Sequence, residues 1–407
     1  MQPTKISHHI SRHLPKNIGS RVQQVVPYLS QQMQYVQRVL GSQQIQPITQ
    51  SNWYQPRETV HGNPVAKPFD TALTNQFPLS TQQWQSIDNY LLAHDTRAFM
   101  VLWKGQLVHQ FHDQFKPHYQ FNSMSMVKTL MALMVGIAID RGVIANVHVK
   151  AADFLPEWQH DQRRDISIEH LLSMQSGLKS DVKVDAKTWV LPVIPLYLGN
   201  DIERTALALP AVAEPGRYFE YNNYNTQILG IILQRAFGLT AAQLLSQYLW
   251  QPLQCHSGFL WLDQPNGHAR TFSAFFALAE DWLRVGQLFI NEGRYNGQQI
   301  VSAQWLREMQ IPRNTVARGV ADGRADYGYQ LWLKAHDYGL IRGIPWFEAT
   351  HATRAFHDDE LVYFEGLRGQ CLFIHPRHEL VVLRMGERPK KDWDMSWMIN
   401  QLSAALN

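Results

Sequence analysis

The sequence predicts a fold that mixes helices and strands, because segments of both kinds can be read from its residues. Residues 126–139 are apolar on nearly every face, as in a buried helix, and end at Asp140-Arg141-Gly142, where glycine is a usual helix stop. A second helix is predicted from Asn225, after a Pro-Gly turn and a short aromatic segment. Residues 371–375 are predicted to form a strand that leads into a hairpin at Pro376.

Composition bounds the size of the core and the kinds of partner. The chain has 407 residues, 45% hydrophobic and 17% charged, which is enough for a large core, and its length suggests two or three domains. Acidic and basic residues are interspersed and the net charge is only +3, so no nucleic-acid partner is expected. Cys255 and Cys371 suit a reducing compartment or two buried thiols, and a disulfide between them stays open.

Residues 1–50 are predicted to be an N-terminal extension, partly helical or disordered. Apolar residues recur at helical spacing between Val22 and Leu40, although Pro27 would break or start such a helix. We favour docking of this helix on the domain over a membrane-surface helix, because its polar face is mainly glutamine. Neither a signal peptide nor a membrane span is expected, so the chain is predicted to be cytoplasmic, or periplasmic if the N-terminus is incomplete.

Ser125 and Lys128 form a Ser-x-x-Lys at the start of the apolar helix. Residues three apart on a helix share a face, so the Lys128 amine can reach the Ser125 hydroxyl. Burial would lower the pKa of the lysine, and the neutral amine can then take the serine proton. The positive end of the helix would favour a developing oxyanion. The alternative is a helix cap followed by a lysine that extends to solvent.

The same tetrapeptide occurs twice more, at Ser176/Lys179 and Ser180/Lys183. Both copies lie in a polar stretch, residues 175–183, without an apolar helix behind them. We predict a loop there, and expect substitution of Ser176 or Ser180 by alanine to be near neutral.

Tyr221 and Asn223 form a Tyr-x-Asn about a hundred residues after Ser125. A tyrosine hydroxyl near a lysine ammonium can have a lowered pKa, and can relay protons between a nucleophile and a leaving group. Asn223 can hydrogen-bond both a lysine and a substrate amide. The alternative is that Tyr218, Tyr221 and Tyr224 only pack.

In order and spacing, the two motifs resemble those of the serine β-lactamase and penicillin-binding-protein superfamily. The likeness is closest to the branch with class C β-lactamases, D-alanyl-D-alanine carboxypeptidases, related esterases and 6-aminohexanoate-dimer hydrolases. The resemblance extends over about residues 51–405. Residues 52–57, at the start of this range, favour the 6-aminohexanoate-dimer hydrolases within the branch. Further segments that look like the family's are residues 166–178, 279–288, 300–309 and 327–332.

The resemblance implies a β-lactamase/DD-peptidase-like fold of the α+β class, with an antiparallel sheet packed by helices. It implies one domain over residues 51–407, with a helical lobe inserted at about residues 145–270. It gives Ser125 the role of nucleophile and divides the role of base between Lys128 and Tyr221. Water would then release the acyl group, and no cofactor would be needed.

The third family motif is where this chain departs. The pattern there is Lys-Thr-Gly or His-x-Gly on an edge strand, and Gly366 fits its glycine, but no lysine or histidine takes the first position. That position normally binds a substrate carboxylate, so β-lactam and peptidoglycan substrates are in doubt. Phe364 or its neighbours are expected to offer apolar surface, and Glu365 to repel an anion if it faces the site. Arg368 is either a replacement cation or an exposed loop arginine, and the oxyanion hole implied by the family uses the N–H groups of Ser125 and Leu367.

The predicted activity is that of a serine hydrolase acting on a small-molecule ester or linear amide, with the oligomeric state left open. The alternatives are a catalytically silent, ligand-binding member of the same scaffold, and a true β-lactamase or D-Ala carboxypeptidase. No metal is expected, because neither His9/His13 nor residues 357–360 match a known ligand pattern. An α/β-hydrolase is not supported, because no Gly-x-Ser-x-Gly occurs.

Overall fold

The computed structural model describes residue 38 and residues 47–65, 67–72, 76–114, 118–181, 192–313, 326–334, 355–390 and 392–407. The helix expected between Val22 and Leu40 lies outside the described residues, except for Arg38. The Arg38 guanidinium is buried and donates hydrogen bonds to the carbonyl oxygens of Gln55, Gly199 and Asp263, at 3.1, 3.0 and 2.8 Å. At this residue the N-terminal segment is therefore held on the domain.

The larger sheet has five antiparallel strands in the order β3-β2-β11-β10-β9. Its β10–β11 pair, with Phe373 opposite Val382, confirms the strand and hairpin predicted around Pro376. β9 lies at the edge of the sheet, as expected for the strand that carries the third motif. The strands are β2 (Thr96–Trp103), β3 (Gln106–His112), β9 (Val362–Gly366), β10 (Gln370–His375) and β11 (Leu380–Gly386).

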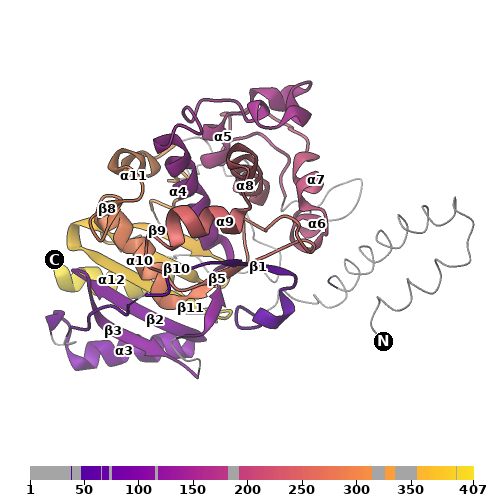
Figure 1. The fold of residues 1–407 in the computed structure, drawn as a ribbon. Helices are drawn as coiled ribbons and strands as arrows, with labels where there is room; N and C mark the ends of the chain where they lie inside the picture. Colours follow the sequence, from indigo (N-terminus) through magenta and orange to yellow (C-terminus); the bar gives the residue numbers. More distant parts are fainter. Residues whose placement is uncertain are drawn as a thin grey trace, which may run out of the picture.

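Helices cover both faces of this sheet (Figure 1). α3 (Thr81–Ala93) and α12 (Met395–Leu406) share an apolar cluster with one face, and α10 (Ala279–Ile290) packs on the other. Side chains alternate along β10, with Phe373 in the α3/α12 cluster and Leu372 in the cluster that includes α10. Because both faces are covered, all six β10 residues are buried.

A smaller antiparallel sheet, in the order β1-β5-β6-β4, supplies the strand that leads to Ser125. Its aromatic side chains form a cluster in which the Phe259 and Phe276 rings stack at 4.4 Å. Cys255 and Cys371 are both buried free thiols, so no disulfide joins them. The strands are β1 (Arg57–Val60), β4 (Gln120–Asn122), β5 (Gly258–Trp261) and β6 (Phe275–Leu278), and a separate hairpin holds β7 (Arg294–Tyr295) and β8 (Gln298–Gln299).

α4 (Val127–Asp140) confirms the predicted apolar helix to within one residue at each end. Its residues 127–138 are all buried, which explains why the sequence is apolar on every face, and Gly142 follows at φ +71°. α4 packs against α8 on one side and α11 on another. α11 spans Ala303–Met309, and the short 3-10 turns outside the region between α4 and β5 are η1 (Ser51–Trp53), η3 (Met124–Met126) and η10 (Pro376–His378).

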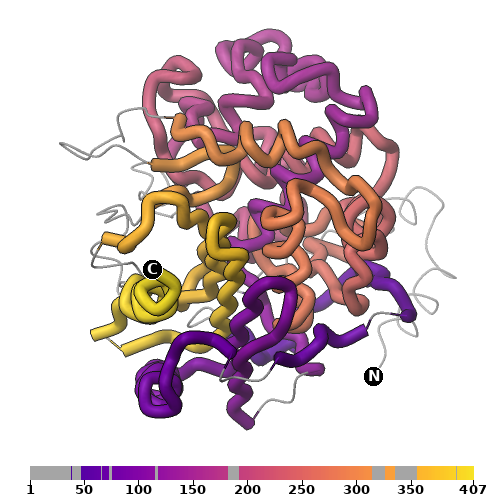
Figure 2. Tube along the Cα trace, turned by 90° about the vertical axis from the view of Figure 1, so that its left-hand side faces the viewer, coloured from indigo at the N-terminus to yellow at the C-terminus, as the bar shows by residue number. Residues whose placement is uncertain are grey.

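Between α4 and β5 the described residues form helices, which lie apart from the larger sheet (Figure 2). The limits of about 145 and 270 for a helical lobe stay a prediction. No single described helix is long and apolar enough to cross a membrane; only α8 and residues 241–250 pass such a test together, and they meet at 79°. The helices are η4 (Ala151–Asp153), η5 (Pro156–Trp158), η6 (Gln162–Asp165), α5 (Ile168–Leu172), α6 (Val193–Leu198), α7 (Ile202–Leu207), α8 (Asn223–Phe237), α9 (Ala241–Leu245) and the π-helical turn η7 (Ser246–Trp250).

Candidate active site

Ser125 lies in η3, the 3-10 turn between β4 and α4. Its neighbours Met124 and Met126 are buried, whereas Ser125 is partly exposed. Met124 has φ +49°, a left-handed conformation that costs a residue with a side chain on the order of 1 kcal/mol or more. The Asn122 side chain accepts a hydrogen bond from the Met124 N–H at 2.9 Å and helps to hold this turn. The chain is thus bent so that the hydroxyl at the start of the buried helix remains reachable.

Lys128 is one turn along and points back at Ser125. Its Nζ lies 2.7 Å from Ser125 Oγ and donates a second hydrogen bond to the Phe272 carbonyl oxygen, also at 2.7 Å. The lysine is only 2% exposed, so it does not extend to solvent. Burial lowers the pKa of Lys128 to about 7, against an opposing effect of the Asp181 carboxylate. Near neutral pH, therefore, a substantial fraction of the lysine is an uncharged amine beside the serine hydroxyl.

Tyr221 completes the group around the serine, with its hydroxyl hydrogen-bonded to Ser125. Its ring stacks on Trp332 at 5.6 Å and lies 5.2 Å from the Lys128 Nζ. Burial raises the pKa of Tyr221 above its usual value, and the charges of Glu365 and Asp181 add to the rise. The lowered pKa expected from the sequence is wrong, because loss of solvent outweighs the opposing hydrogen bond with Ser125. Tyr221 is a neutral phenol at pH 7.

Asp181 is a buried acid beside this group, and no sequence pattern pointed to it. Its Oδ2 accepts hydrogen bonds from the Asn223 N–H and Nδ2, at 2.9 and 2.8 Å. Burial raises the pKa of Asp181 to about 6, while the Asn223 hydrogen bonds and Lys128 act the other way. The Asn223 amide thus donates to Asp181, whereas the sequence suggested the lysine as its partner. No motif marks Asp181, which follows a loop serine about fifty residues after Lys128.

The loop predicted around the second Ser-x-x-Lys is confirmed as far as residue 181, and Lys183 lies outside the described residues. This loop is buried rather than surface-exposed. Ser176 donates a 2.6 Å hydrogen bond to Asn225 Oδ1, and the Lys179 carbonyl oxygen accepts one from Asn222 Nδ2 at 2.9 Å. The loop is thereby attached to the start of α8. Because Ser176 makes this buried contact, Ser176→Ala is expected to cost some stability, which the sequence alone did not indicate.

β9 passes directly beside the serine turn. A Cβ added at Gly366 would lie 2.5 Å from the Ser123 carbonyl oxygen, so only glycine allows this approach. Leu367, the next residue, therefore lies next to the turn that carries Ser125. Phe364 is buried, with its ring 5.6 Å from Phe289 of α10, so the apolar surface expected from Phe364 itself is wrong, and that expected from its neighbours stays a prediction.

Arg368 lies in the turn after β9 and makes an ion pair. Its Nη1 is 2.7 Å from Glu387 Oε2, and the two side chains are 15% and 13% exposed. Glu387 also accepts hydrogen bonds from the Thr49 hydroxyl and the Ile48 N–H. Arg368 is therefore not an exposed loop arginine. Its role as a cation for substrate stays a prediction.

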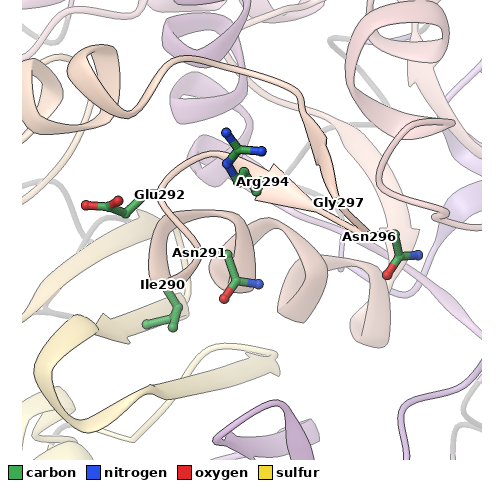
Figure 3. A pocket seen from close by; sticks show the side chains of 6 residues that line it. All are labelled: Ile290, Asn291, Glu292, Arg294, Asn296 and Gly297. Atoms are coloured by element: carbon green, nitrogen blue, oxygen red, sulfur yellow. The ribbon is translucent and has the colours of Figure 1, made fainter.

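A separate shallow hollow lies at the end of α10 and the β7–β8 hairpin (Figure 3). It is wide open, and no residue around Ser125 lines it. The side chains drawn there spread apart rather than converging on one point. It offers no nucleophile or acid–base pair, and its lining residues are Ile290, Asn291, Glu292, Arg294, Asn296 and Gly297.

Known proteins share this architecture. A family model described as Beta-lactamase matches residues 93–402, a range that contains Ser125, Lys128, Tyr221 and Gly366. The 6-aminohexanoate-dimer hydrolase of Paenarthrobacter ureafaciens is 24% identical over 323 residues, which is 73% of this chain and 74% of that protein.

Two solved structures show the same fold. A Bacillus anthracis protein provisionally assigned as a 6-aminohexanoate-dimer hydrolase superimposes with a TM-score of 0.71, at 19% identity, over 88% of this chain and 92% of that one. EstCE1, a hydrolase with promiscuous acyltransferase activity, gives 0.60 at 15% identity, over 80% and 97%. The expected β-lactamase/DD-peptidase-like fold is confirmed.

Proposed function

Because the chain belongs to the Beta-lactamase family, we propose that it is a serine hydrolase that cleaves small esters or linear amides through an acyl-enzyme on Ser125. The observation that carries the proposal is the 2.7 Å contact between Lys128 Nζ and Ser125 Oγ. A serine hydroxyl becomes a useful nucleophile only when a neighbouring base takes its proton. Lys128 is such a base, because burial lowers its pKa to about 7.

In the acylation step, Ser125 Oγ forms a bond to the substrate carbonyl carbon while its proton moves to the neutral Lys128 amine. The carbonyl oxygen becomes an oxyanion. By likeness to the family, the N–H groups of Ser125 and Leu367 would stabilise it, and the close passage of Gly366 along Ser123 supports their proximity. Donors of this kind contribute about 3 kcal/mol each to transition-state stabilisation in other hydrolases.

Collapse of the intermediate breaks the bond to the leaving group, which must accept a proton. Tyr221 is suited to supply it, since it is neutral and hydrogen-bonded to Ser125. The phenol then recovers a proton from the Lys128 ammonium, which returns the amine to its neutral state. In the second half of the reaction water attacks the acyl-enzyme, and the same groups take its proton and return it to Ser125.

The edge strand β9 limits which substrates fit. Position 364 of the third motif holds phenylalanine, buried against α10, so no lysine or histidine is there to bind a substrate carboxylate. Glu365 raises the pKa of Tyr221, which places its negative charge close enough to disfavour an anionic substrate. Short neutral esters and linear amides meet neither obstacle. We expect higher kcat/KM for short p-nitrophenyl esters than for nitrocefin, and nitrocefin turnover comparable with the best ester would contradict this substrate class.

A second candidate is a ligand-binding member of the family without turnover, which the incomplete third motif favours. Reaction of the purified chain with a fluorophosphonate, followed by peptide mass spectrometry, distinguishes the two. Covalent mass on the peptide that contains Ser125, absent from Ser125→Ala, supports the hydrolase. An unlabelled wild-type protein would favour the silent binder.

A further inference from the structure

Three potential metal ligands meet at the end of β10 that is farther from Ser125. β10 begins at Gln370, opposite Gly366, and ends at His375. Six residues of strand separate its two ends by about 17 Å. His378 follows in η10, and Asp358 approaches from the segment before β9. This cluster of Asp358, His375 and His378 has no part in the proposed hydrolysis.

The ligand atoms of the cluster are close together. Asp358 Oδ2 lies 3.0 Å from His375 Nε2 and 4.0 Å from His378 Nε2. One ligand atom from each of the three residues lies within 4.8 Å of the other two. His375 is fully buried, and the side chains of His378 and Asp358 are only 12% and 13% exposed.

The buried ring nitrogens lack the partners that an ordinary buried histidine would have. His375 Nε2 faces Asp358 Oδ2 at 3.0 Å, whereas among the described residues His375 Nδ1 and His378 Nε2 have no hydrogen-bond partner. Buried polar atoms are nearly always hydrogen-bonded or bound to a metal or to ordered water. A simple His375–Asp358 pair would leave His375 Nδ1 and His378 Nε2 unsatisfied, so that explanation is incomplete.

We propose that Asp358, His375 and His378 bind one zinc ion, with a water molecule as the fourth ligand. Bonds of 2.0–2.2 Å in a tetrahedral site place ligand atoms about 3.4 Å apart, between the 3.0 and 4.0 Å observed here. Two imidazoles and one carboxylate suit zinc, whereas calcium and magnesium prefer an all-oxygen ligand set. The absence of metal expected from the sequence rested on local ligand patterns, and Asp358 comes from a different segment than His375 and His378.

The role of such a zinc ion would be structural. Asp358 belongs to a segment held on α12, because Asn400 accepts a hydrogen bond from the His357 N–H and donates one to the Ala355 carbonyl oxygen, at 2.9 and 3.0 Å. Zinc would tie this segment to the β10–β11 hairpin through His375 and His378. It should therefore raise the melting temperature without changing the pH dependence of hydrolysis.

The test uses the untagged full chain, freed of metal with a chelator and dialysed against micromolar Zn²⁺. Zinc per chain is measured by mass spectrometry, and Co²⁺ is added in parallel for its visible absorption. We expect the wild type to bind one equivalent of zinc per chain, and His378→Ala and Asp358→Asn to bind none at this site. Zinc should raise the melting temperature of the wild type but not that of either variant.

Two controls separate this site from other histidines. His9→Ala/His13→Ala removes the N-terminal pair. His148→Ala removes a surface histidine whose Nδ1 lies 3.2 Å from Glu169 but which, among the described residues, belongs to no group of three potential ligands. Both control variants should still bind one equivalent of zinc per chain. Equal zinc content in the wild type, His378→Ala and Asp358→Asn would overturn the proposal, as would a wild type that retains no zinc. Retained ester hydrolysis shows that a variant is folded, and Asp358→Asn decides alone if His378→Ala does not fold.

Discussion

Two Ser-x-x-Lys segments with the same spacing have different structures in this chain. At the first, the backbone turns into α4, and Lys128 Nζ reaches Ser125 Oγ at 2.7 Å. At the second the backbone is a loop, and Ser176 bonds to Asn225 instead. The comparison shows that the spacing creates a serine–lysine pair only where the backbone is helical. The tetrapeptide by itself carries no chemistry.

The two segments are nevertheless connected. Asp181 lies two residues after the second segment, and its buried carboxylate raises the pKa of Lys128 against the larger lowering effect of burial. The loop around Ser176 thus adjusts the charge state of the pair in the helix. The first two predictions below change one segment and use the other as the control.

The largest effect is expected at the two serines. Ser125→Ala removes the proposed nucleophile and should lower kcat/KM for esters by about 10⁵-fold, with the fold unchanged. Ser176→Ala loses one buried hydrogen bond, so it should lose about 1 kcal/mol of stability and keep its activity. Ester kinetics and thermal unfolding of both variants measure this difference. A Ser125→Ala enzyme with a tenth of wild-type activity would mean that the nucleophile lies elsewhere.

The lysines give the next comparison. Lys128→Ala and Lys128→Arg should both lose about 10⁴-fold in kcat, because arginine cannot be deprotonated in a protein. Lys179→Arg, in the loop, should be unaffected in kcat. Steady-state ester kinetics test the set. An active Lys128→Arg enzyme would show that this residue supplies only positive charge.

Tyr221→Phe should reduce the rate by about 100- to 10,000-fold, the usual range for a general acid–base group. The loss should be larger for amides than for activated esters, since a poor leaving group needs the proton that Tyr221 supplies. Measuring kcat for one substrate of each kind provides the ratio. An equal loss for both would assign Tyr221 to packing against Trp332.

Local features were predictable and long-range electrostatics were not. The helix after Ser125 follows from the run of apolar residues, and the contact with Lys128 follows from helical spacing. The raised pKa of Tyr221 depends on burial by segments distant in sequence, such as the one carrying Trp332. Asp181 and the Arg368–Glu387 ion pair likewise depend on how remote segments fold together, which no local pattern records.

The smallest effect is expected from Asp181→Asn. Its carboxylate raises the pKa of Lys128, so its removal should lower that pKa and shift the rise of kcat/KM to lower pH, by about one unit. Asp153→Asn, an exposed acid in η4, is the control and should leave the profile in place. The pH dependence of kcat/KM for a neutral ester gives the measurement. A shift to higher pH would mean that Asp181 does not act on Lys128 through its charge.

The central claim is that the neutral amine of Lys128 activates Ser125. The rate at which a neutral fluorophosphonate labels Ser125, followed by mass spectrometry from pH 5 to 9, tests it most directly. Because deprotonation of Lys128 creates the base, the labelling rate should rise through about pH 7 and then level off. In Lys128→Arg the rate should be low at every pH. A rate that is independent of pH over this range, or that is unchanged in Lys128→Arg, would contradict the account.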